Sequence, residues 1–203
     1  MSHNVAIDGP AGAGKSTIAK QIARKLGYIY VDTGAMYRAM AYYLIQNQVD
    51  AADQEAIAAA CQHADISICY QDGEQVVLLN GENVNAYLRT EAVGNMASVS
   101  SVVPEVRKKL VELQQKLARE TDVVMDGRDI GTVVLPDADV KVYLTASVET
   151  RAKRRFLELQ EKGESADLAK IAADIEDRDY RDMHRDISPL RQAEDATLVD
   201  SSD

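Results

Sequence analysis

The sequence predicts an α/β fold in which a five-stranded parallel sheet is flanked by helices and carries a small antiparallel insertion. Three observations lead to this prediction. Short apolar runs recur along the chain, longer segments of helical pattern separate them, and one central stretch interrupts the alternation with two tight-turn signals. At 203 residues the chain is long enough to bury a hydrophobic core.

Five apolar runs are the expected strands. They are NVAID at 4–8, YIYVD at 28–32, DVVMD at 122–126, VKVYL at 140–144 and TLVD at 197–200. Continuous apolar runs of this length are typical of strands that are covered on both faces of a parallel sheet. We therefore expect all five strands to be buried.

Helical segments lie between these runs. STIAKQIARKL is followed by Gly27, a residue type that commonly ends a helix, and PEVRKKLVELQQKLARE begins with Pro104 in its first turn. Nearer the C-terminus, SVETRAKRRFLELQEKG ends at Gly163, and the charge-rich DLAKIAADIEDRDYRDMHRD precedes the stop signal SPL at 188–190. Alternating strands and helices of these lengths favour the parallel sheet.

Residues 64–102 form the expected insertion. ISICYQ and QVVLLN are separated by Asp-Gly at 72–73, and Asn-Gly follows at 80–81. These dipeptides favour the tight turns that join antiparallel strands. We therefore divide the chain into a core of residues 1–63 and 103–203 and an inserted unit of residues 64–102.

Composition narrows the function classes. The formal net charge of −10 argues against a protein that coats nucleic acid or an anionic membrane, since such proteins present a basic surface. Cys61 and Cys69 have no companion at metal-binding spacing, so we expect reduced thiols. The N-terminal sequence shows no targeting pattern, and no apolar window reaches the roughly 18 residues of a membrane span. We expect a cytoplasmic protein.

A glycine-rich loop follows the first predicted strand. It matches the pattern G-x-x-x-x-G-K-[ST], which binds phosphate when it lies between a strand and a helix, as it does here. Glycines let the backbone N–H groups turn inward, and the helix N-terminus adds a positive partial charge. Lys15 is expected at the β and γ phosphates, and the Ser16 hydroxyl at Mg²⁺. The expected ATP-binding residues are Gly9, Pro10, Ala11, Gly12, Ala13, Gly14, Lys15, Ser16 and Thr17.

The loop alone does not define a transferase, because switches, motors and regulators use the same cradle. Neither D-x-x-G nor N-K-x-D occurs in the chain, which argues against a guanine-nucleotide switch. Arginine placement is more informative. Arg38 and Arg128 each follow a predicted strand, at the carboxyl edge where open α/β sheets bind ligands. Arg178, Arg181 and Arg185 share the last predicted helix, where nearby aspartates also allow surface ion pairs.

Four separated motifs carry a family resemblance. In chain order they are AIDGPAGAGKST, DTGAMYRA, MDGRDIGTVV and RDYRDMHRDISPL. Together they resemble the bacterial cytidylate kinases, a branch of the nucleoside monophosphate kinases, over essentially the whole chain. The resemblance implies a P-loop kinase core, a monophosphate-binding insertion at 64–102 and a short lid at about 150–165. Members usually continue into a further helix beyond TLVDSSD, so we expect apolar surface near that end to be exposed.

The resemblance also implies roles for individual residues. The acceptor phosphate would be bound by Arg38, Arg128 and Arg185. The cytosine edge would be read by Ser98, Arg107 and Asp129. The ribose hydroxyls would contact Arg178 and Asp182, and the lid would bring Arg151, Arg154 and Arg155 over ATP.

Elementary chemistry agrees with this assignment. A carboxylate at Asp129 accepts a hydrogen bond from the cytosine amino group and repels the uracil oxygen at the same position. Lys15, Arg128 and Arg185 are the expected catalytic residues, since transfer between two anionic nucleotides requires fixed cations and Mg²⁺ more than a general base. Two interpretations stay open for Asp126 and Asp32, which either orient a metal-bound water or stabilise local structure.

The expected reaction is transfer of the γ-phosphoryl group of ATP to CMP, and to dCMP as well. We expect a monomer whose partners are these small molecules, with no nucleic-acid polymer and no membrane. Two alternatives stay open: a kinase for another monophosphate such as UMP or AMP, and a regulatory module that binds ATP.

Overall fold

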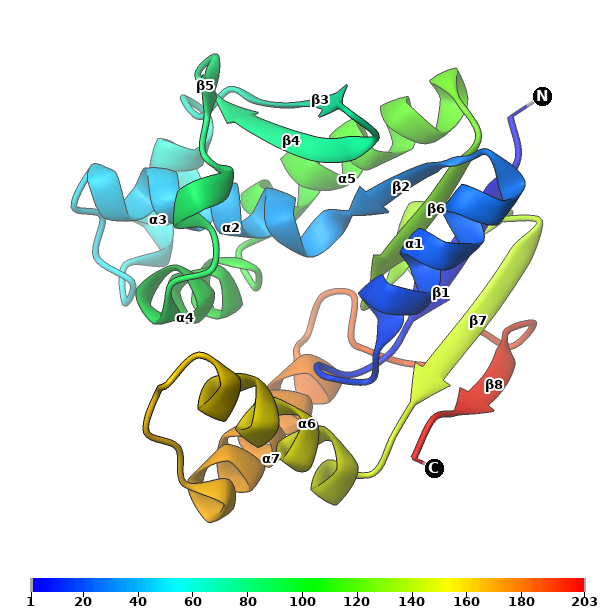
Figure 1. Cartoon of the computed structure of the whole chain (residues 1–203). Helices are drawn as coiled ribbons and strands as arrows, with labels where there is room; N and C mark the ends of the chain where they lie inside the picture. The colour runs from blue at the N-terminus through cyan, green and yellow to red at the C-terminus, as the bar shows by residue number, and fades with distance from the viewer. Residues whose placement is uncertain (1, 203) are drawn as a thin grey trace. The chain divides into compact units, whose positions relative to one another are not determined.

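Five strands form the main sheet, in the order β2-β6-β1-β7-β8 (Figure 1). They are β1 (Asn4–Asp8), β2 (Ile29–Asp32), β6 (Val123–Gly127), β7 (Val140–Thr145) and β8 (Thr197–Asp200). The computed structural model describes residues 2–202. All five predicted strands are confirmed to within two residues at either end. The predicted parallel sheet is confirmed as well, because β1 pairs in parallel with β6 and β7, and β7 with β8.

The described chain falls into two compact units. The phosphate-loop unit comprises Met1–Ile29 and Asp122–Asp203, and the central unit comprises Tyr30–Thr121. The predicted insertion at 64–102 lies within the central unit. Its separate status as a monophosphate-binding part stays a prediction.

Strand register positions the site within the phosphate-loop unit. Asp8, the last residue of β1, is paired with Gly127 of β6 on one side and with Tyr143 of β7 on the other. The loops that leave β1 and β6 therefore begin next to each other at the carboxyl edge of the sheet. This is the edge at which open α/β sheets bind their ligands.

Helices of the phosphate-loop unit begin and end at recognisable residues. They are α1 (Lys15–Leu26), η2 (Ile130–Val134), α6 (Val148–Glu161) and α7 (Leu168–His184). Gly27 ends α1 with φ 71°, and its N–H donates to the carbonyl of Ala23, as the sequence predicted. Ser147 caps α6 and Asp167 caps α7 by accepting backbone N–H groups. Arg185 follows the end of α7 in an extended conformation, so the prediction that it lies on this helix is wrong.

The central unit joins a small sheet to helices. Its elements are α2 (Thr33–Gln46), α3 (Gln54–Cys61), β3 (Ile66–Gln71), β4 (Glu74–Leu79), β5 (Glu82–Asn83), η1 (Asn85–Tyr87), α4 (Glu91–Ser100) and α5 (Pro104–Glu120). The two predicted tight turns are confirmed: Asp72 and Gly73 both have positive φ, as do Asn80 and Gly81, and the strands they join are antiparallel.

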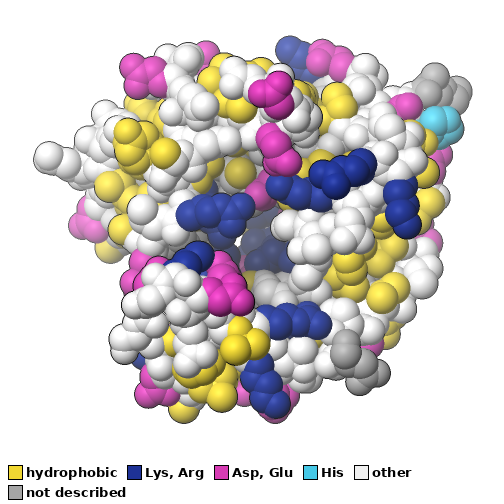
Figure 2. Space-filling view, in the orientation of Figure 1, with side chains coloured by type: hydrophobic (Ala, Val, Ile, Leu, Met, Phe, Trp, Pro, Cys, Tyr) yellow, Lys and Arg dark blue, Asp and Glu magenta, His cyan; other side chains and the backbone are white. Residues whose placement is uncertain are grey.

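The last strand departs from the expectation of burial. All four residues of β8, which lies at one edge of the sheet, are exposed, with Leu198 57% and Val199 39% accessible. Figure 2 shows hydrophobic side chains on the surface near the position of β7 and β8 in Figure 1. The expected exposure of apolar surface near this end is confirmed, and the expectation that all five strands are buried is wrong for β8.

Charged side chains of both signs lie on the face of the molecule that Figure 2 draws. Acidic and basic side chains are interspersed over the face in Figure 2, without one continuous basic sheet on it. Between residues 2 and 202, the structure contains no helix with the length and apolarity that a membrane crossing requires.

Candidate active site

The glycine-rich loop is tightly built between β1 and α1. Gly9 has φ 148°, and a Cβ atom at this position would overlap the carbonyl oxygen of Leu144 in β7. Gly14 adopts the left-handed conformation with φ 89° immediately before α1, whose N-terminus has no side-chain cap. Because Gly14 has no side chain, the first N–H groups of α1 are not capped by the residue before the helix, an arrangement suited to phosphate.

Lys15 lies inside this loop. It is 6% exposed, and its Nζ donates to the carbonyl of Pro10 at 2.7 Å. Burial, together with the nearby Arg128, lowers the pKa of Lys15 to about 7, even though Asp126, Asp8 and Asp182 act in the opposite direction. A polyphosphate entering the loop would favour the charged form of this amine.

The Ser16 hydroxyl and the Asp126 carboxylate lie together next to the loop. The Ser16 hydroxyl donates to Oδ2 of Asp126 at 2.9 Å, and Asp126 is 5% exposed at the end of β6. Between residues 2 and 202 no cluster of three or more His, Cys, Asp or Glu has metal-binding geometry. A hydroxyl with one carboxylate nevertheless fits Mg²⁺, which takes one or two protein oxygens together with waters and substrate phosphates. Asp32, by contrast, caps α2 by accepting from the N–H of Ala35 at 3.0 Å.

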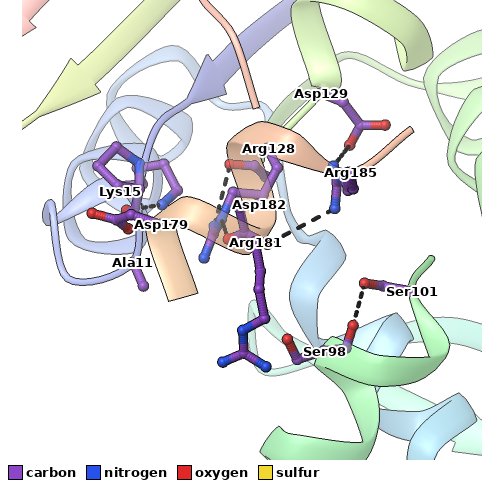
Figure 3. Close-up of polar contacts among 12 residues, drawn as sticks. Ala11, Lys15, Ser98, Ser101, Arg128, Asp129, Asp179, Arg181, Asp182 and Arg185 are labelled. Carbon is purple, nitrogen blue, oxygen red and sulfur yellow. Dashed lines mark hydrogen bonds and ion pairs between the residues drawn. The ribbon is translucent and has the colours of Figure 1, made fainter. Parts of the chain in front are cut away.

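A cluster of two arginines and two aspartates lies beyond β6 (Figure 3). Nε of Arg128 donates to Oδ2 of Asp182 at 2.9 Å, and Nη1 of Arg185 lies 4.0 Å from Oδ1 of the same carboxylate. Nη2 of Arg185 lies 3.9 Å from Oδ1 of Asp129. Arg185 thus bridges the loop after β6 and the C-terminal end of α7.

The electrostatics of this cluster favour charged groups. Burial alone would raise the pKa of Asp182, but Arg128, Arg178 and Arg185 outweigh it and hold that pKa below its ordinary value. The cluster therefore keeps the Asp182 carboxylate ionised and brings several arginine side chains close together. Such a site can bind an anion with fixed charge-assisted hydrogen bonds.

The three arginines predicted to form a lid have separate partners. Arg151 is 4% exposed, and its guanidinium donates to the carbonyl of Ala146 at 2.9 Å, to the carbonyl of Ala11 at 3.1 Å and to Asp179 at 2.6 Å. Arg154 donates to the carbonyl of Ser201, and Arg155 pairs with Glu158 on the exposed side of α6 at 3.0 Å. Arg151 is therefore the one member of the three that contacts the phosphate loop.

The central unit carries the remaining predicted residues. Arg107 on α5 is 3% exposed, its Nη1 donates to the carbonyl of Ser101 at 3.1 Å, and its guanidinium lies 5.4 Å from the ring centre of Tyr37. The carbonyl of Ser98 accepts from the Ser101 hydroxyl at 2.9 Å (Figure 3). Arg38 is half-buried on α2. Ser98 and Arg107 thus share one neighbour, Ser101.

Sequence reasoning missed two residues that hold the site. Asp8 accepts two backbone N–H groups beyond β6, and Asp179 pairs with Arg151. Asp8 precedes the glycine loop directly, and its charge within an apolar strand was the available signal. Asp179 lies one residue after Arg178 and had no comparable signal, because its partner is 28 residues away.

Comparisons with known proteins identify the family. The cytidylate kinase family model matches residues 5–203. The chain is 54% identical to the cytidylate kinase of Lactobacillus johnsonii over 198 residues, which cover 98% of this chain and 86% of that protein. It is 52% identical to the cytidylate kinase of Caldicellulosiruptor saccharolyticus over 199 residues, covering 98% and 88%.

A solved structure shares the fold at low sequence identity. An uncharacterized protein from Eubacterium ventriosum matches with a TM-score of 0.50 and 13% identity, covering 100% of this chain and 92% of that one. This similarity shows the fold alone. The family match and the relatives, which align with nearly the whole chain, show the family. This chain belongs to the cytidylate kinase family.

Proposed function

We propose that the chain transfers the γ-phosphoryl group of ATP to CMP, giving ADP and CDP. The observation that carries the proposal is the strand register, which starts the phosphate loop and the Arg128 loop side by side at the edge of one sheet. A donor loop with a cation cluster next to it suits transfer between two phosphates better than binding of one nucleotide alone.

In this reaction a phosphate oxygen of CMP attacks the γ-phosphorus of ATP, and the bond from that phosphorus to the β–γ bridging oxygen breaks. The attacking oxygen is already ionised near neutral pH, since the second pKa of a phosphate monoester is about 6. No general base is therefore required. Lys15, Arg128 and Arg185 would offset the charge that two polyphosphates bring together, and Arg38 would help to bind the acceptor phosphate.

Base and sugar would be recognised by separate groups. Asp129 would accept from the cytosine amino group, and Arg107 and Ser98 would contact the ring edge. Arg178 and Asp182 would contact the ribose hydroxyls. A buried polar site left unpaired by the wrong base discriminates on the order of 10⁴-fold at best, so CMP is expected to be preferred over UMP.

Mg²⁺ would be bound through Ser16, with Asp126 accepting from the hydroxyl or from a metal-bound water, and it would neutralise charge on the β and γ phosphates. The contact between Ser16 and Asp126 supports this role over a purely local one for Asp126.

The remaining assignments follow from the same reaction. We expect Gly9 to Thr17 to surround the ATP phosphates, with Arg151 holding the loop and Arg154 and Arg155 reaching ATP when the lid closes. We also expect a cytoplasmic monomer. Cys61 and Cys69 are both free thiols, which suits a reducing compartment.

An ADP-release assay tests the proposal. The protein would be mixed with ATP and Mg²⁺ and offered CMP, dCMP, UMP or AMP in turn. We expect acceptor-dependent ADP with CMP and dCMP, and much slower release with UMP and AMP. ADP release that ignores the acceptor would favour a regulatory ATP-binding module, and equal rates with CMP and UMP would remove the role given to Asp129.

A further inference from the structure

Asp8 makes a contact that the reaction above does not use. Its carboxylate, 4% exposed at the end of β1, accepts from the N–H of Ile130 at 2.8 Å and from the N–H of Gly131 at 2.7 Å. These two N–H groups open the short helical turn η2, which begins directly after Asp129. Asp8 thus caps a helical turn that lies 122 residues away in the sequence.

Asp129 occupies the cap position of the same turn but does not cap it. Aspartate is among the best N-cap residues, because its side chain usually accepts an N–H two or three positions ahead. Here the Asp129 side chain makes no such bond and instead faces Arg185 at 3.9 Å. A second carboxylate, supplied by the neighbouring strand, does the capping.

The space beside Gly131 in this turn is also filled. A Cβ atom added at Gly131 would lie 3.2 Å from Cδ of Lys141 and 3.4 Å from Oδ2 of Asp8. Nζ of Lys141 in turn donates to the carbonyl of Pro136 and to Asp195. The Asp8 carboxylate and the Lys141 side chain therefore both lie close to the position that a Cβ atom at residue 131 would take, which leaves little room there.

We propose that Asp8 is a positioning residue for acceptor choice: by accepting the two N–H groups that open η2, it fixes the backbone next to Asp129 and so fixes where the Asp129 carboxylate lies. The inference rests on the proposed function, since it presumes that Asp129 reads the base. Asp8 itself touches neither nucleotide in this account. It acts through the backbone that carries Asp129.

Burying the Asp8 carboxylate costs free energy, which supports a specific role for this residue. Burial, together with the nearby Asp129, raises the pKa of Asp8 to about 6, even though the Gly131 and Ile130 N–H groups and Lys15 act in the opposite direction. An ionisable group held in this way is stabilised by its two N–H partners and destabilised by its burial. An apolar residue at the end of β1 would avoid that cost but would leave both N–H groups unsatisfied.

Asp8→Asn tests the proposal. The amide keeps one acceptor oxygen and removes the other, so one of the two cap bonds is lost while the volume is unchanged. We expect the ratio of kcat/KM for CMP to kcat/KM for UMP to fall about tenfold, the size expected from one lost hydrogen bond next to a group that touches the substrate. The KM for ATP should change less than this ratio, because the hydrogen bonds of the Asp8 carboxylate go to η2 and not to the phosphate loop.

Asp139→Asn is the matched control. Asp139 is also a carboxylate that accepts a backbone N–H of β1, at Asn4 and 2.8 Å, but at the opposite end of the strand from the site. It should leave the CMP to UMP ratio unchanged. Gly131→Ala is the second test variant if Asp8→Asn folds poorly. It pushes on the same backbone without altering a charge, and the same fall in the ratio is expected.

A double substitution distinguishes the base-reading role of Asp129 from the positioning role of Asp8. If Asp129 reads the base and Asp8 positions it, Asp129→Asn lowers the ratio, and adding Asp8→Asn lowers it no further. If Asp129→Asn leaves the ratio unchanged, the base-reading role fails, and the inference fails with it. If Asp129→Asn lowers the ratio while Asp8→Asn does not, or if the two effects multiply, the positioning role alone is overturned.

Discussion

Replacing Arg151 by alanine tests how α6 and α7 are held to the phosphate loop. The Arg151 guanidinium is buried and makes three hydrogen bonds, one of them to the carbonyl of Ala11 in the loop and one to Asp179 on α7. Removing one partner of a buried ion pair leaves the other charge uncompensated and costs about 3 to 5 kcal/mol. We expect the free energy of unfolding to fall by that amount, measured by urea denaturation followed by circular dichroism.

Arg155→Ala is the control on the same helix. Arg155 pairs with Glu158 at 3.0 Å, but both side chains are about half exposed. Surface pairs of this kind contribute about 0.2 to 1 kcal/mol. The double variant Arg151→Ala with Asp179→Asn should recover part of the loss, since it also removes the stranded carboxylate. Equal losses for Arg151→Ala and Arg155→Ala, or no recovery in the double variant, would refute the reasoning.

Three further predictions concern the loop, the cluster and pH. Gly9→Ala should abolish ATP binding by calorimetry, because its Cβ has no room beside Leu144; binding within twofold of the parent would contradict this. Arg128→Lys should lower kcat strongly while its unfolding midpoint moves little, since lysine keeps the charge but not the planar fork; an unchanged kcat would count against the site. The pKa of Asp8 is raised to about 6 in the folded protein, so the folded state binds this proton more tightly than the unfolded state does. The resulting stabilisation is complete below about pH 4 and is lost as the pH rises through 6. Over that pH range, the free energy of unfolding of the parent protein should fall by about 3 kcal/mol relative to that of Asp8→Asn. Parallel curves of unfolding free energy against pH for the two proteins would contradict this.

Local patterns explain why most of the fold could be predicted. The apolar runs, the Gly27 stop and the Asp-Gly and Asn-Gly turns each depend on neighbouring residues, and each is confirmed. Helices α3 and α4 were not predicted, because they are short and their apolar pattern is weak. Their caps, Asp53 and Thr90, were the available signals. The exposure of β8 was not predicted, because the composition of a strand does not reveal which of its faces the rest of the chain covers.

Long-range contacts limit how much of the site can be predicted from the sequence. Motif and family resemblance pointed to the loop and to Arg128, Asp129 and Asp182, and the structure brings these residues together within the phosphate-loop unit. The capping of η2 by Asp8 and the pairing of Arg151 with Asp179 join residues 122 and 28 positions apart. No spacing rule links such residues, so only the folded chain shows them as partners.

Phosphoryl transfer itself is the most direct test of the account. ATP labelled at the γ-phosphate would be incubated with the protein, Mg²⁺ and CMP, and the products separated and identified by phosphorus NMR. We expect the label in the β-phosphate of CDP, one CDP for each ADP, and loss of both products when Lys15 is replaced by methionine. Label released as inorganic phosphate, with no labelled CDP, would contradict the account.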